Sequence, residues 1–148
     1  MPTPIARFDI PYAHWSLKVG RDAPAPGEIV AQIADLEQGI HNLVLTPTGS
    51  VPTEPEKGCD VMDYIDRPPA VAIPALTETI WEGLNRWHPR IVVGSVQVTH
   101  DPSDREFSRY ACPIFWGPRE SILAEFIRTV VPLSRSEIAR RLGAGTVF

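Results

Sequence analysis

The sequence predicts a small α+β fold, in which two main amphipathic helices pack on a short antiparallel sheet and a helical extension follows. Two segments carry apolar residues at helical spacing, a β-branched run follows the second of them, and 16 prolines divide the chain into short elements. At 148 residues the chain has the length of one domain. We expect an N-terminal arm and loop over residues 1–28, a core domain over 29–117 and a C-terminal helical extension over 118–148.

The first helix is expected over residues 28–45, because its apolar residues recur every three or four positions: Ile29, Ile33, Leu36, Ile40, Leu43 and Val44. The second is expected over 74–87, with Pro74 in its first turn and Pro89 as its stop. Its buried stripe consists of Leu76, Ile80, Leu84 and Trp87, with Trp81 beside it.

The other elements are shorter. Residues 14–19 alternate weakly as a strand does, and residues 49–69 have the composition of a long ordered loop with a helical turn around 61–65. A strand over 91–100 and a returning strand over 106–112, or as far as Phe115, are expected to form an antiparallel pair with Pro113 at an edge or bulge. Residues 119–131 are expected to be a third helix, and Ser134–Glu137 is a capping box that opens a last one ending at Gly143.

Composition narrows the class of protein. Hydrophobic residues make up 43% and charged residues 22%, as in a globular domain. The net charge of −4 and the lack of a basic stripe argue against a nucleic-acid partner, and no apolar run approaches the roughly 20 residues of a membrane span. Because the N-terminus has no apolar signal core, we interpret Cys59 and Cys112 as reduced cytosolic thiols.

Residues suited to catalysis are scattered. The four histidines and two cysteines lack the spacing of a metal site, so we predict no catalytic, metal-binding or cofactor-binding residues. The alternative is an acidic hydrolase that uses two carboxylates. Its candidate residues are Glu28, Asp35, Glu54 and Glu56, for which the sequence indicates no apolar pocket.

Two other local patterns are better developed. Thr46-Pro47-Thr48-Gly49 is followed by Pro55-Glu56-Lys57-Gly58, and Trp87-His88-Pro89-Arg90 joins the second helix to a strand. Arg90 is either a surface cation beside a turn or a guanidinium that binds a partner's carboxylate. If it lies at an interface, its replacement by alanine should leave the fold intact and block assembly.

In order and spacing, these motifs resemble the baseplate assembly protein W family of contractile phage tails, which is related to a baseplate subunit of type VI secretion. The similarity covers about residues 29–100, and His88 stands where the family's Glu-Pro-Arg tripeptide has glutamate. The resemblance implies a non-enzymatic structural subunit of the baseplate wedge, made in the host cytoplasm and present in multiple copies in the virion tail. Its implied interface residues are Gly49, Pro55, Gly58, Trp87, His88, Pro89 and Arg90.

The same resemblance implies the partners: other wedge proteins, the tube or hub, and the tail sheath, whose first ring would add to an exposed strand. We expect that strand in the pair spanning Ile91 to Phe115. Some family members have been described as lysozyme-like, so a peptidoglycan hydrolase of the tail stays open as the alternative. A small adaptor unconnected with phage is a third possibility. Residues 119–148, for which the family gives no expectation, are predicted to dock on another baseplate subunit.

Overall fold

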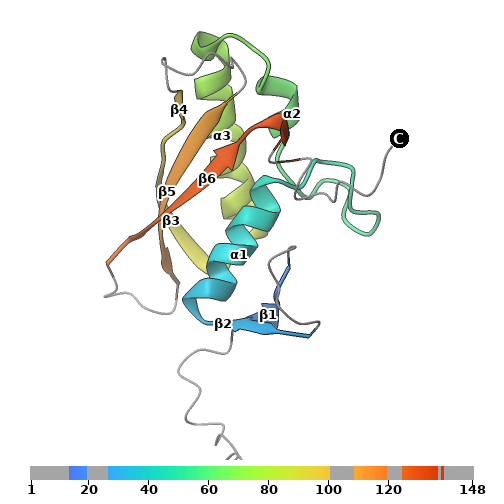
Figure 1. Cartoon of the computed structure of the whole chain (residues 1–148), viewed down its shortest axis with the longest axis vertical. Helices are drawn as coiled ribbons and strands as arrows, with labels where there is room; N and C mark the ends of the chain where they lie inside the picture. Colours follow the sequence, from blue (N-terminus) through green and yellow to red (C-terminus); the bar gives the residue numbers. More distant parts are fainter. Residues whose placement is uncertain (1–13, 20–26, 101–108, 120–124, 137, 139–148) are drawn as a thin grey trace, which may run out of the picture.

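The computed structural model describes residues 14–19, 27–100, 109–119, 125–136 and 138, and within them the fold is α+β, as predicted. The elements in chain order are β1 (Trp15–Leu17), β2 (Ile29–Ala31), α1 (Ile33–Val44), α2 (Val61–Tyr64), α3 (Pro69–Trp87), β3 (Ile91–Val96), β4 (Thr99–His100), β5 (Tyr110–Pro118) and β6 (Ile127–Leu133) (Figure 1). None of the helices in the described part of the chain has the length and apolar character needed to cross a membrane.

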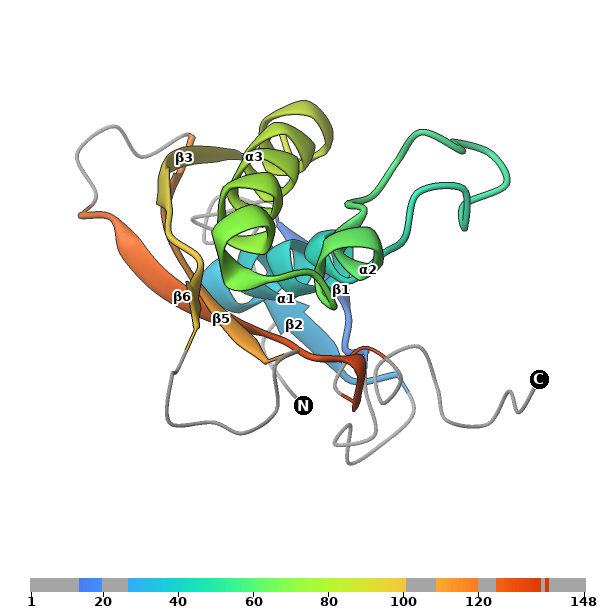
Figure 2. The same ribbon diagram turned by 90° about the horizontal axis from the view of Figure 1, so that it is seen from above.

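The main sheet has β5 at its centre. β3 and β4 pair with one side of β5 and β6 with the other, all antiparallel. Helices α1 and α3 pack against each other and cover one face of this sheet (Figure 2). The core fills the space between, and its fully buried side chains include Leu36, Ile40, Leu76, Ile80, Leu84, Ile114, Trp116, Val131 and Leu133.

Helix α1 begins later than predicted. Residues Ile29–Ala31, expected in the helix, form β2 and pair with β1 in a separate two-stranded sheet. Gln32, with φ of 59°, turns the chain between β2 and the helix. Such a φ is uncommon for a residue with a side chain, and no local pattern in the sequence indicates it. The short strand predicted over 14–19 and the helical turn around 61–65 are both present.

Helix α3 begins earlier than predicted, at Pro69, so Pro74 lies inside it rather than in its first turn. Pro74 is exposed, and so is Ala70, whose carbonyl group loses its usual intrahelical donor because proline has no N–H. Leu76 and its stripe are buried as expected, but Trp81 is 39% exposed and does not belong to the core.

The strand predicted over 91–100 is divided into β3 and β4, and the start of the returning strand at 106 lies outside the described residues. Pro113 occupies the central strand, where a proline normally interrupts a hydrogen-bond ladder. Its carbonyl accepts a hydrogen bond from the Gln97 amide at 3.0 Å. Its nitrogen, which carries no hydrogen, therefore faces the break between β3 and β4.

The helix predicted over 119–131 is wrong in the part that can be described. Ile127–Leu133 form β6, which pairs with β5 from Tyr110 to Trp116, while residues 120–124 lie outside the described range. Thr129, Val131 and Leu133 alternate into the core, a period of two that the sequence interpretation passed over. β6 completes the main sheet, so residues 127–133, on the far side of the expected boundary at residue 118, pair with the core strand β5.

The predicted last helix does begin where the capping box indicated. Residues 135, 136 and 138 are helical, and the Ile138 amide donates to the Ser134 carbonyl at 2.9 Å. Residues 137 and 139–148, including the predicted end at Gly143, lie outside the described residues. Ile138 is 2% exposed and joins the core, so this turn packs on its own domain.

Candidate protein-binding site

Three of the seven predicted interface residues, Pro55, Gly58 and Trp87, lie together beside α3. The 46–60 loop folds back on itself, with the Gly49 amide donating to the Pro55 carbonyl at 2.7 Å. Gly58 has φ of 130°, and a Cβ there would lie 2.3 Å from the Thr46 carbonyl oxygen, so only glycine fits. The loop reaches Trp87 at the end of α3, whose indole is half-buried.

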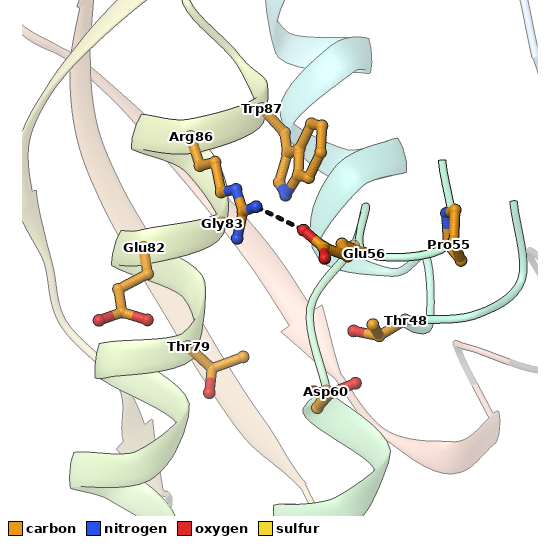
Figure 3. Close-up of a pocket in the computed structure, with 10 residues that line it drawn as sticks. Thr48, Pro55, Glu56, Asp60, Thr79, Glu82, Gly83, Arg86 and Trp87 are labelled. Atoms are coloured by element: carbon orange, nitrogen blue, oxygen red, sulfur yellow. Dashed lines mark hydrogen bonds and ion pairs between the residues drawn. The ribbon is translucent and has the colours of Figure 1, made fainter. Parts of the chain in front are cut away.

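A cavity of about 590 Å³ separates this loop from α3 (Figure 3). At this cavity Arg86 Nη2 lies 2.5 Å from Glu56 Oε2, and both side chains are largely exposed. Asp60 and Glu82 add two more carboxylates to the lining. This polar lining is suited to the side chains of another protein rather than to an apolar small molecule.

The helix-to-strand junction is arranged differently from what the sequence led us to expect. His88 is turned inward and is 6% exposed, with its ring against Gly39 of α1. A Cβ at Gly39 would lie 2.4 Å from His88 Nε2, so this glycine makes room for the ring. Burial, with a smaller contribution from the nearby Arg90, lowers the pKa of His88 to about 4. Pro89 is exposed, and its carbonyl accepts a hydrogen bond from Arg119 Nε at 2.7 Å.

Arg90 forms an ion pair within the chain. Its guanidinium lies 2.8 Å from Oδ2 of Asp35, which is 1% exposed. The Ser16 hydroxyl donates to the other oxygen of the same carboxylate. Asp35 thus joins three elements, β1, α1 and the start of β3, and the geometry predicts a stability cost when Arg90 is removed. The guanidinium is still 40% exposed, so its role at an interface stays a prediction.

The β1–β2 hairpin lies at one end of the molecule, below α1 in Figure 1. The side-chain amide of Gln38 holds it to α1, donating to the Leu17 carbonyl at 2.8 Å and accepting from the Val19 amide at 3.0 Å. A residue of a neighbouring parallel strand would bond the same two backbone groups, the Leu17 carbonyl and the Val19 amide. Gln38 therefore blocks strand addition at Leu17–Val19 on the outer edge of β1.

Within the described part of the chain, no strand pairs with the other edge of the hairpin. The pairs that exchange backbone hydrogen bonds are His14–Gln32, Ser16–Val30 and Lys18–Glu28. Because these pairs alternate with non-bonded ones along an antiparallel ladder, the amide and carbonyl groups of Ile29 and Ala31 point away from β1. The hairpin also turns an apolar face outward. Its large members are Trp15, Leu17, Val19 and Ile29, each exposed by about 59% to 65%.

All four carboxylates proposed for an acidic hydrolase are held by cations. Besides the Asp35–Arg90 and Glu56–Arg86 pairs, Lys18 binds Glu28 at 3.1 Å and Lys57 binds Glu54 at 2.9 Å. The general acid of a glycosidase must carry a proton, which an apolar pocket favours and an adjacent cation opposes. Each of these four carboxylates is thus engaged in an ion pair within the chain, and the enzymatic alternative stays open to experiment.

The described residues contain no group of three or more His, Cys, Asp or Glu side chains placed to hold a metal ion. Cys59 and Cys112 are buried, and burial raises the pKa of each thiol to about 12. Both cysteines are therefore protonated at neutral pH and act as core residues.

The fold and these surfaces define a small α+β domain with a polar cavity beside α3 and an exposed apolar face on the β1–β2 hairpin. Neither the known protein families nor the curated proteins include one whose sequence matches this chain. The structure, however, is similar to the crystal structure of a "putative tail lysozyme" from Geobacter sulfurreducens, with a TM-score of 0.59. The two sequences are 22% identical, and the match covers 71% of this chain and 94% of that one. This similarity establishes a shared fold.

Proposed function

We propose that this chain is a non-enzymatic structural subunit of a contractile phage-tail baseplate, located in the wedge. The fold shared with a protein named for the phage tail supports the tail assignment. The motif resemblance over residues 29–100 supports the more specific role in the wedge. In this role the chain joins larger wedge proteins to the tube or hub, is present in several copies, and starts the polymerisation of the sheath.

The observation that carries the proposal is the open edge of β2. The outward amide and carbonyl groups of Ile29 and Ala31 can pair with an added strand, and the apolar face of the hairpin can receive its alternate side chains. An isolated two-stranded hairpin is marginally stable, so further strands would also stabilise this one. A receiving edge was also expected between Ile91 and Phe115: there β5 is paired on both sides, whereas β3 pairs with β5 alone among the described strands and keeps an outer edge, so that expectation stays a prediction.

The partner of each surface is assigned from where that surface lies in the fold. The groove beside α3, lined in part by Pro55, Gly58 and Trp87, lies between the 46–60 loop and the helix rather than on the hairpin. We assign this groove to a wedge or hub protein and the hairpin to the sheath. A subunit that links two assemblies requires two separate surfaces of this kind.

Ala31→Pro tests strand addition. It removes one outward N–H group without removing a hydrogen bond of the β1–β2 ladder, and Ala31→Ser is the matched control that keeps the N–H. In a host lacking the native gene, we expect Ala31→Pro to enter baseplates that carry a tube but no sheath, as seen by electron microscopy. Normal sheaths on particles that contain Ala31→Pro would overturn the assignment of β2.

A peptidoglycan zymogram tests the enzymatic alternative. Purified protein should produce no clearing, in keeping with the ion pairs that hold the four candidate carboxylates. Clearing by the native chain that is lost when Glu28, Asp35, Glu54 and Glu56 are replaced by alanine would instead identify a hydrolase.

A further inference from the structure

The β1–β2 hairpin contributes no side chain to the hydrophobic core. Among the described residues, none of the buried hydrophobic side chains lies between positions 14 and 31. The side of the hairpin that faces α1 carries Ser16 on β1 and Val30 on β2, both half-buried, while the other residues of the two strands are exposed. Opening the hairpin therefore uncovers little apolar surface, and the hydrophobic effect resists it only weakly.

Polar side chains of α1 hold the hairpin instead. Asp35 accepts a hydrogen bond from the Ser16 hydroxyl. The side-chain amide of Gln38 donates to the same hydroxyl at 3.0 Å and to the Leu17 carbonyl at 2.8 Å, and it accepts from the Val19 amide at 3.0 Å. The position of the hairpin on α1 thus depends on the hydrogen bonds of two side chains, three of which Gln38 makes.

The turn between β2 and α1 opposes this position. Gln32 has φ of 59° and ψ of −132°, a conformation that residues with a side chain rarely adopt. Such a conformation is unfavourable and persists only where surrounding contacts impose it. The Gln32 amide donates to the His14 carbonyl at 3.0 Å, which ties the conformation to the pairing of the two strands. Opening the hairpin would release this strain.

From these observations we propose that the β1–β2 hairpin opens and closes as a unit while the core stays folded, and that Gln38 keeps it closed. The β2 edge is formed in the closed state and is lost in the open state. Gln38 is therefore a positioning residue for strand addition, since it acts through β1 and does not touch the added strand. The local opening does not depend on the assignment to a phage tail, whereas the link to strand addition rests on the proposed function.

Hydrogen exchange of the purified chain, followed by NMR, measures the opening. The Lys18 amide donates to the Glu28 carbonyl at 2.8 Å and the Gln32 amide to His14, so both bonds lie within the hairpin and neither involves Gln38. We expect both amides to share one opening free energy, far below that of the β5–β6 ladder amides and nearly independent of urea. Equal opening free energies and urea dependence for the hairpin and the ladder would overturn the proposal, because the hairpin would then open only with the core.

Gln38→Ala tests the residue that keeps the hairpin closed. It should speed the exchange of the Lys18 and Gln32 amides roughly 10-fold and leave the β5–β6 amides unchanged. The matched control is Gln97→Ala, at an exposed glutamine between β3 and β4, which should alter neither set. Unchanged hairpin exchange in Gln38→Ala, or an equal change in the β5–β6 amides, refutes the role of Gln38.

Electron microscopy then tests the link to strand addition. In a host lacking the native gene, Gln38→Ala should give a smaller fraction of sheathed tails than Gln97→Ala. Equal fractions, despite the faster exchange, would overturn the positioning role. Ala31→Pro gives a separate answer, because it removes an outward N–H group of β2 and so tests the proposed function itself.

Discussion

Replacing Arg90 by methionine should destabilise the fold by about 2 kcal/mol. The variant keeps most of the side chain's apolar length but leaves Asp35 buried, at 1% exposure, without its cation. Removing one partner of a fully buried ion pair costs roughly 3–5 kcal/mol. We lower this figure because the Arg90 side chain is 40% exposed, so water already screens part of the interaction.

A double-mutant cycle isolates the interaction. Asp35→Asn keeps the shape and the hydrogen bond from Ser16 but removes the charge, and we expect it to cost about 1 kcal/mol. The double variant should be more stable than the sum of the single losses predicts, with a coupling energy of about 1–2 kcal/mol. Urea unfolding followed by tryptophan fluorescence measures all four proteins, because Trp116 is fully buried.

Arg86→Met is the matched control, since Arg86 also pairs with a carboxylate, but both partners are more than 60% exposed. An exposed pair of this kind contributes up to about 1 kcal/mol and often nothing measurable. If Arg90→Met costs no more than Arg86→Met, or if the coupling energy is below about 0.3 kcal/mol, the pair does not hold the hairpin, α1 and β3 together. Arg90 would then be available for the interface role that the sequence suggested.

Three further outcomes are expected. Leu84→Ala should lower the free energy of unfolding by roughly 2–5 kcal/mol and Val71→Ala, on the exposed side of α3, by less than about 0.5 kcal/mol; equal losses would mean that this stripe is not core. Folding lowers the pKa of His88 from 6.5 to about 4. The neutral, buried ring therefore contributes fully to the free energy of unfolding above pH 6.5, and this contribution is lost as the pH falls toward 4. That loss of roughly 2–3 kcal/mol in urea unfolding should shrink in His88→Gln, although Asp35 and His14 also act on this site, and an unchanged slope would contradict the assignment. Deleting residues 119–148 removes β6 and should give an aggregating chain in light scattering, whereas a soluble fragment with a cooperative melt would restore the idea of a separate extension.

The helices and the first strand of the main sheet could be predicted because their periodicity is local. The Leu76, Ile80 and Leu84 spacing identifies α3 whatever surrounds it. β6 could not be identified in this way, since Phe126, Ile127 and Val130 also fit a helical stripe. Only the pairing of β6 with β5 shows that alternate residues of this segment face the core. Tertiary contacts therefore decided between a helical and a strand pattern in the same residues.

The site was predicted in part for a similar reason. Gly49, Pro55 and Gly58 were found from turn-forming residues; Pro55 and Gly58 lie beside Trp87 and Gly49 is hydrogen-bonded to Pro55, while their binding of a partner stays a prediction. The partner of Arg90 was missed because Asp35 lies 55 residues earlier in the chain, beyond any local motif. The open edge of β2 was missed because Gln32 turns the chain at a φ that the sequence does not indicate.

The contact between Gln38 and β1 has a consequence for how strands could add to this chain. A side-chain amide already occupies the Leu17–Val19 flank of the hairpin, where an adjoining strand would otherwise bond. The Leu17–Val19 part of β1 is therefore blocked, whereas the groups of Ile29 and Ala31 on β2 are not, which favours lengthening of the ribbon from β2. If strands polymerise on this hairpin, they would be added on the β2 side and not on the blocked part of β1. The direction of growth would then be set by the first subunit.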